Sequence, residues 1–204
     1  MGVPVLVIGE SGSGKTYSLR NFKPNEIGIF SVEKGRLPFR GDFKVVKHAT
    51  YSDINKIFKD PKLKRYAIDD SQFLMVNDMF DRAKETGYQK YTDLALSFRN
   101  LVHDVNTKLP DDVIVYFLHH TEFDSNSGKL KAKTVGKMID QYLTLEGCFD
   151  IVLLAQTDGT EHYFVTQSDG YTTAKSPAEM FGDAQKISND LKMVDDAIRS
   201  YWGL

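Results

Sequence analysis

The alternation of apolar and polar positions divides the chain into strand-like and helix-like segments. A continuous apolar run at Val3–Ile8 predicts a strand buried on both faces, as in a parallel sheet. Similar runs predict further strands at Glu26–Val32, Phe43–Val46, Arg65–Asp69, Val113–Leu118, Phe149–Ala155 and His162–Thr166. A turn signal at Thr157–Gly159 separates the last two strands and predicts a late antiparallel hairpin.

Helical spacing occurs between these strands. One apolar face, ended by Pro110, comprises Leu94, Phe98, Leu101, Val102, Val105 and Leu109. Shorter helices are predicted at Lys15–Phe22, Ser52–Lys59 and Val135–Leu145. Near the end, Ser176–Glu179 has the form of a capping box with proline at the first helical position. It predicts a last helix whose apolar face carries Ile187, Leu191, Val194, Ile198 and Tyr201.

This order of elements predicts one α/β domain over residues 1–204, with a mostly parallel central sheet flanked by helices. The 41% apolar and 26% charged content is typical of a globular protein. A net charge of -2 argues against a uniformly basic nucleic-acid binder but permits a local basic patch. The single cysteine excludes an intramolecular disulfide framework, and no apolar run approaches the roughly 20 residues of a membrane span. We expect a cytoplasmic protein without a membrane partner.

The first strand runs into a complete G-x-x-x-x-G-K-[ST] motif. Glycines let the backbone turn its N–H groups around an anion, and a helix start adds partial positive charge. The predicted nucleotide contacts are Gly9, Glu10, Ser11, Gly12, Ser13, Gly14, Lys15, Thr16 and Tyr17. Lys15 is expected to reach the outer phosphates of ATP, and the Thr16 hydroxyl to bind Mg²⁺.

A phosphate loop of this kind works with an acid at the end of a neighbouring strand. The strand Arg65–Asp69 ends in such an acid, and we assign Asp69 to the magnesium ion. Asp70 follows it directly. Its carboxylate is expected either to polarise water or to cap the next helix.

Three classes of phosphate-loop protein fit these features unequally. A GTPase needs an N-K-x-D guanine reader, and Asn55–Phe58 has phenylalanine in place of the aspartate. A small-molecule kinase needs a lid rich in arginine, whereas the segment between the central strand and the later strands has lysines and no arginine. Arg20, Arg36 and Arg40 remain available for an acceptor site. An ATP-hydrolysing domain needs a glutamate after the second strand to activate water, and Glu33 lies there, before Gly35.

Several segments together resemble a known family. The phosphate loop, "FSVEKG", "YAIDDSQFLM", "YFLHHTE" and "TTAKSPAEMF" are similar to the RecA-like ATPases carried by bacteriophages, described as AAA-domain nucleotide-binding proteins. Some members act in single-strand annealing. The resemblance covers roughly residues 3 to 182.

The resemblance implies roles for particular residues. Glu33 matches the water-activating glutamate and Asp69 the magnesium aspartate. His119, His120 and Thr121 lie where such enzymes place a sensor of the γ-phosphate, although a histidine pair at a strand end also suits a structural hydrogen bond. The catalytic set expected on these grounds is Lys15, Glu33, Asp70 and His120.

The resemblance also implies a mobile DNA-binding loop and a cation from a neighbouring subunit. The segment 126–137 contains Lys129, Lys131, Lys133 and Lys137 and no acid, which suits phosphate contacts with single-stranded DNA; a solvated hairpin is the alternative. Lys175 or Lys133 is the expected trans cation in a homo-oligomer.

These features predict a Mg-dependent ATPase that serves phage DNA recombination or replication through single-stranded DNA, or through a phage or host recombination protein. Two alternatives stay open: a small-molecule or nucleotide kinase, and an assembly factor gated by ATP that does not bind DNA.

Overall fold

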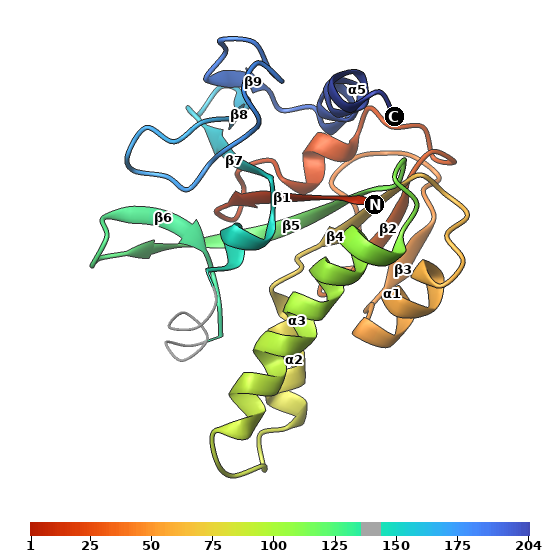
Figure 1. Ribbon diagram of the computed structural model, residues 1–204, viewed down its shortest axis with the longest axis vertical. Coiled ribbons are helices and arrows are strands. Elements are labelled where there is room, and N and C mark those ends of the chain that lie inside the picture. The colour runs from red at the N-terminus through yellow and green to blue at the C-terminus, as the bar shows by residue number, and fades with distance from the viewer. Residues whose placement is uncertain (136–143) are drawn as a thin grey trace.

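The computed structural model describes residues 1–135 and 144–204. Within them, strands alternate with helices around one central sheet (Figure 1). The strands are β1 (Val3–Gly9), β2 (Gly28–Ser31), β3 (Val45–Lys47), β4 (Arg65–Asp69), β5 (Ile114–Asp124), β6 (Lys129–Ala132), β7 (Ile151–Thr157), β8 (His162–Val165) and β9 (Lys186–Ser188). The α-helices are α1 (Tyr51–Phe58), α2 (Phe73–Asp81), α3 (Gln89–Lys108) and α5 (Leu191–Trp202), and two 3₁₀ turns are η1 (Thr16–Leu19) and η2 (Leu145–Cys148).

The strand order is β3-β2-β4-β5-β1-β7-β8-β9, and β6 pairs with the outer part of β5. All neighbours from β3 to β7 run parallel, whereas β8 is antiparallel to β7 and β9 to β8. The prediction of a mostly parallel sheet with a late antiparallel hairpin is therefore confirmed. In this order β5 lies between β1 and β4.

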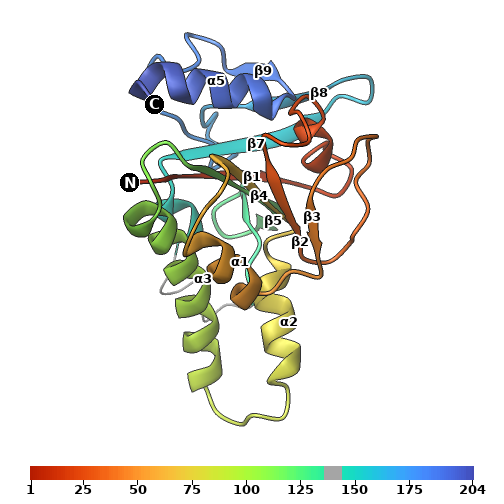
Figure 2. The same cartoon turned by 90° about the vertical axis from the view of Figure 1, so that its right-hand side faces the viewer.

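Both faces of the sheet are covered, which explains the continuous apolar runs. Along β1, Leu6 and Ile8 pack into a cluster shared with α1, α2 and α3, while Val5 and Val7 pack into a second cluster with η1 and α5. Figure 2 shows α5 above the sheet and α1, α2 and α3 below it, where α2 and α3 extend as an arm.

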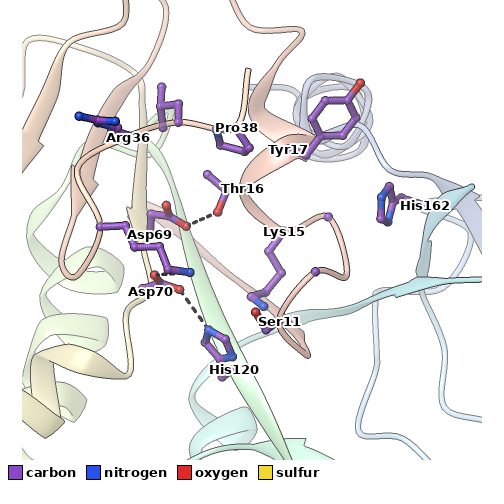
Figure 3. Close-up of a pocket in the computed structure, with 14 residues that line it drawn as sticks. Ser11, Lys15, Thr16, Tyr17, Arg36, Pro38, Asp69, Asp70, His120 and His162 are labelled. Carbon is purple, nitrogen blue, oxygen red and sulfur yellow. Dashed lines mark hydrogen bonds and ion pairs between the residues drawn. The ribbon is translucent and has the colours of Figure 1, made fainter. Parts of the chain in front are cut away.

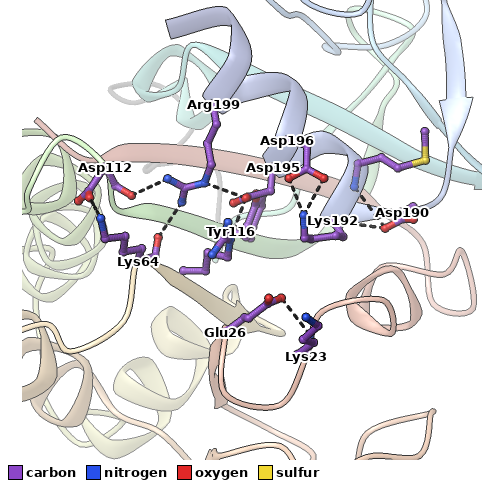
Figure 4. Close-up of polar contacts among 12 residues, drawn as sticks. Lys23, Glu26, Lys64, Asp112, Tyr116, Asp190, Lys192, Asp195, Asp196 and Arg199 are labelled. Carbon is purple, nitrogen blue, oxygen red and sulfur yellow. Dashed lines mark hydrogen bonds and ion pairs between the residues drawn. The ribbon is translucent and has the colours of Figure 1, made fainter. Parts of the chain in front are cut away.

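The last helix is fixed to the sheet by a buried carboxylate, Asp195, which is fully inaccessible to solvent. It accepts hydrogen bonds from Arg65 Nε and Arg199 Nε, both at 2.8 Å, and from the Tyr116 hydroxyl at 3.1 Å (Figure 4). Two guanidinium groups compensate the desolvation of this carboxylate, and its bonds to Arg65 and Tyr116 connect α5 to β4 and β5.

The predicted start of the last helix is wrong. Residues 176–185 form turns instead of a helix, and Glu179 has a φ of 65°. The Ser176 hydroxyl, expected to cap a helix, donates to the Thr166 carbonyl. The helix starts at Leu191 because Asp190 caps it, accepting from the amides of residues 192 and 193. Ile187 lies in β9.

The helix predicted at Lys15–Phe22 is shorter than expected. Only Thr16–Leu19 is helical, as a 3₁₀ turn. Its tight geometry follows from local competition: the Ser18 hydroxyl bonds the Lys15 carbonyl, and Arg20 and Asn21 turn away to bond Asn189 and Asp190.

Two predictions concern the segment after the central strand. β5 continues to Asp124 and pairs with β6, so the lysine-bearing segment forms a hairpin, the alternative considered from the sequence. Most of the helix predicted at Val135–Leu145 lies outside the described residues, as does Lys137. Leu145 itself begins η2.

Candidate functional site

The loop between β1 and η1 turns on two glycines. Gly12 and Gly14 have φ angles of 83° and 89°, a conformation that favours glycine. A Cβ atom at Gly14 would also stand 2.9 Å from the His162 ring. Ser11, Gly12 and Gly14 line a cavity, so this exposed stretch of backbone faces the space that a ligand would enter.

Lys15 is held over the loop. Its ammonium group donates to the carbonyls of Gly9 and Glu10, both at 2.8 Å. Burial lowers its pKa to about 8, against the opposing influence of Asp70 and Asp69. The loop therefore holds a poorly solvated cation that an incoming anion would stabilise.

Thr16 and Asp69 meet across the sheet, as the predicted magnesium pair. The Thr16 hydroxyl donates to Asp69 Oδ1 at 2.7 Å. Asp69 is buried at the end of β4, and burial raises the pKa of its carboxyl to about 6. A hydroxyl and a carboxylate at the base of this loop are oxygen ligands of the kind that Mg²⁺ prefers.

Asp70 lies beside this pair with its backbone in the left-handed conformation, at a φ of 59°. His120 Nε2 donates to Asp70 Oδ1 at 3.2 Å, and Lys34 Nζ lies 3.7 Å from Oδ2. Burial alone would raise the pKa of Asp70, but the hydrogen bond from His120 and the charge of Lys34 outweigh it and hold the pKa below its usual range. Its carboxylate contacts these two side chains and no helix amide, so the helix-cap interpretation does not hold.

His119, next to His120, has a different environment. It is fully buried, and its ring bonds the Ser71 hydroxyl at 2.9 Å and the Lys133 carbonyl at 2.7 Å. Burial lowers its pKa to about 4, so the ring is neutral at pH 7. His119 connects β4 and β5 to the base of the β5–β6 hairpin, which matches the structural interpretation of one of the two histidines.

These groups converge on one cavity of about 430 Å³ (Figure 3). Its lining residues are Ser11, Gly12, Gly14, Lys15, Thr16, Tyr17, Lys34, Arg36, Leu37, Pro38, Asp69, Asp70, His120 and His162. Figure 3 shows Lys15 and Thr16 centrally, Asp69, Asp70 and His120 on one side, and Tyr17 and His162 on the other. The loop, the acid pair and one histidine were predicted from the sequence to work together, and the structure brings them together.

Other predicted residues lie elsewhere. Glu33 is exposed and does not line the cavity, whereas its neighbour Lys34 does. Lys129, Lys131 and Lys133 lie on or beside β6. Lys175 bonds Val152 through its backbone in both directions, beside β7.

Sequence reasoning missed Lys34, Leu37, Pro38 and His162 as lining residues. Lys34, Leu37 and Pro38 follow β2. They lie within five residues of Glu33, so the prediction of a catalytic residue in this segment could have drawn attention to them. His162 starts β8, more than a hundred residues from the loop, and no sequence motif connects it to Gly14. It reaches the cavity because β8 pairs with β7, the neighbour of β1.

No protein-family model matches the chain, and a comparison with curated proteins finds no match. Among the helices that the structure describes, none has the length and apolar character needed to cross a membrane.

Because Lys15 is buried with its charge, we predict that this residue lowers the stability of the folded protein. A lysine whose pKa falls from 10.5 to about 8 on folding binds fewer protons in the native state between those pH values. Its charge therefore costs stability in full below pH 8, and this cost disappears as the pH rises to 10.5. We expect Lys15→Met to raise the free energy of unfolding at pH 7 by on the order of 1–3 kcal/mol, a gain that shrinks toward pH 10.5.

Urea unfolding of the parent and the variant, across this pH range, measures the difference. A Met variant that is less stable than the parent at pH 7 would contradict the assignment of Lys15 as a desolvated cation that costs stability.

Proposed function

We propose that the chain binds Mg-ATP in this cavity and hydrolyses it, as a phosphate-loop ATPase of RecA-like type. The observation that supports this proposal most strongly is the hydrogen bond between Thr16 and Asp69 at the base of the loop. The glycine backbone of that loop and the buried Lys15 face the same cavity. The loop and Lys15 would hold the triphosphate, and Thr16 and Asp69 would hold the magnesium ion.

The donor set fits a magnesium ion that shares its ligands with a nucleotide. Among residues 1–135 and 144–204, no group of three His, Cys, Asp or Glu side chains gathers as a metal site. Mg²⁺ usually binds one or two protein oxygens and completes its coordination shell with phosphate and water. The Thr16 hydroxyl and the Asp69 carboxylate fit this coordination. When bound, the ion would neutralise charge on the outer phosphates.

Hydrolysis needs a water molecule directed at the terminal phosphorus. In this step the water oxygen bonds to phosphorus, the bond to the bridging oxygen breaks so that ADP leaves, and a proton of the water passes to an oxygen of the released phosphate. Asp70 and His120, paired at 3.2 Å inside the cavity, are the groups best placed to orient that water. Glu33, on the exposed turn after β2, stays a prediction from the resemblance.

The binding test uses Lys15→Ala. Removing the ammonium group deletes charge-assisted hydrogen bonds to phosphate, so Mg-ATP affinity should fall at least tenfold in isothermal titration calorimetry, since such bonds are worth about 1.5–3 kcal/mol. Lys84→Ala, at an exposed site after α2, is the matched control and should bind as the parent does. Equal affinity of the Lys15 variant and the parent would refute the site.

We further propose that single-stranded DNA is the partner, through the β5–β6 hairpin. Figure 1 shows this hairpin projecting from the sheet. The Lys133 amide donates to the His120 carbonyl at 2.8 Å, so the hairpin begins where the nucleotide cavity ends. Glu122 pairs with Lys131 at 3.4 Å, which reduces the net positive charge of the hairpin.

The salt dependence of ATP turnover in the presence of single-stranded DNA tests this second proposal. Lysine contacts with phosphates release counterions, so single-stranded DNA should stimulate ATP turnover at low salt, and the stimulation should disappear as salt is raised. The double variant Lys129→Glu/Lys133→Glu should lose the stimulation. Turnover that ignores DNA at every salt concentration would support the assembly-factor alternative.

Arg36 gives the kinase alternative its one supporting observation, because it lines the cavity from the segment after β2. The same turnover assay separates the two activities. Free phosphate supports the ATPase, and phosphate attached to an added nucleoside or metabolite supports the kinase.

A further inference from the structure

A second lysine, Lys34, lines the cavity in addition to Lys15. Lys34 follows β2 and lines the same space as Lys15 and Asp70. The strand keeps its pairing slightly beyond β2, since the Val32 amide donates to the Asp69 carbonyl at 3.1 Å. Val32 packs in the same buried cluster as Phe30, and Lys34 is two residues further on. The end of β2 thus brings Lys34 to the acid pair at the end of β4.

The three positive or ionisable groups around Asp70 differ in how firmly they are held. Lys15 is bound to two loop carbonyls at 2.8 Å, and His120 donates to Asp70 Oδ1. Lys34 meets Oδ2 at 3.7 Å, and its side chain is 65% exposed, whereas that of Asp70 is 6% exposed. A long ion pair with an exposed partner contributes little to stability, so the Lys34 ammonium group is available for exchange to a stronger anion.

We propose that Lys34 binds the terminal phosphate of the nucleotide as a cation supplied in cis, leaving Asp70 when that phosphate enters. The inference rests on the proposed function and deepens it. A terminal phosphate carries more charge than one carboxylate and forms stronger charge-assisted hydrogen bonds with an ammonium group. Release by Lys34 also leaves Asp70 Oδ2 open to a water molecule, while His120 still holds Oδ1.

This role differs from the trans cation that the family resemblance implies. Lys175 is tied through its backbone to Val152 and is not among the cavity residues, and Lys133 lies beyond β6. Lys15 and Lys34, which line the cavity, therefore both come from one chain. Lys34 should accordingly distinguish ATP from ADP, which lacks the terminal phosphate.

The test compares both nucleotides on one variant. Lys34→Ala should weaken Mg-ATP binding about tenfold in isothermal titration calorimetry and change Mg-ADP binding by less than about twofold. Lys34→Arg should recover most of the ATP affinity, because it keeps the charge. Lys84→Ala, again exposed and distant, should match the parent for both nucleotides.

The outcomes separate the two proposals. Equal losses for ATP and ADP, or no loss for either, would overturn the role of Lys34 while leaving the nucleotide site intact. A parent protein that binds neither nucleotide would overturn the proposed function and this inference with it. Lys34 is exposed, so its replacement should not disturb the fold, and circular dichroism of the variants checks this. A loss of ATP affinity in a folded variant then reflects the missing charge.

Discussion

The parallel alignment of β1, β5 and β4 is the constraint on which the candidate site depends. Gly9 pairs in register with His120, and Ile68 with Phe117, so all three strands end at the same edge of the sheet. The predicted phosphate loop leaves β1, His120 ends the inner part of β5, and Asp69 and Asp70 lie at the end of β4. Because the strands are held by a core on both faces, these ends have little freedom to separate.

The electrostatics of the site follow from that packing. Lys15 and Asp69 are both buried. Burial lowers the pKa of Lys15 and raises the pKa of Asp69, which in each case favours the neutral form. Asp70 is kept ionised by its partners, His120 and Lys34. A ligand that brings negative phosphate to Lys15 and a divalent cation to Asp69 compensates both buried charges at once. The site therefore holds two desolvated ionisable groups, and their burial reduces the stability of the fold.

Much of this arrangement could be predicted from the sequence because it depends on local pattern. The strand Arg65–Asp69 is confirmed with the predicted bounds, and the loop motif, Asp69 and His120 are found around one cavity. These features rest on buried strands and on a motif of fixed spacing that follows one of them.

Elements that depend on tertiary contacts were harder to predict. The capping-box pattern at Ser176 was overruled because its hydroxyl bonds Thr166, and Asp190 capped the helix instead. Lys34 and His162 carry no motif, and they reach the cavity only through strand pairing. Both failures come from contacts between segments that are distant in the sequence: a side-chain hydrogen bond in the first case and strand pairing in the second.

Hydrogen–deuterium exchange tests the central claim, that backbone amides of the loop bind a magnesium triphosphate, most directly. With a non-hydrolysable ATP analogue and Mg²⁺, exchange should slow in peptides that cover residues 9–19 and 33–38, while the α1 peptide, residues 51–58, should be unchanged. Unaltered exchange across residues 9–19 at saturating analogue would contradict the account.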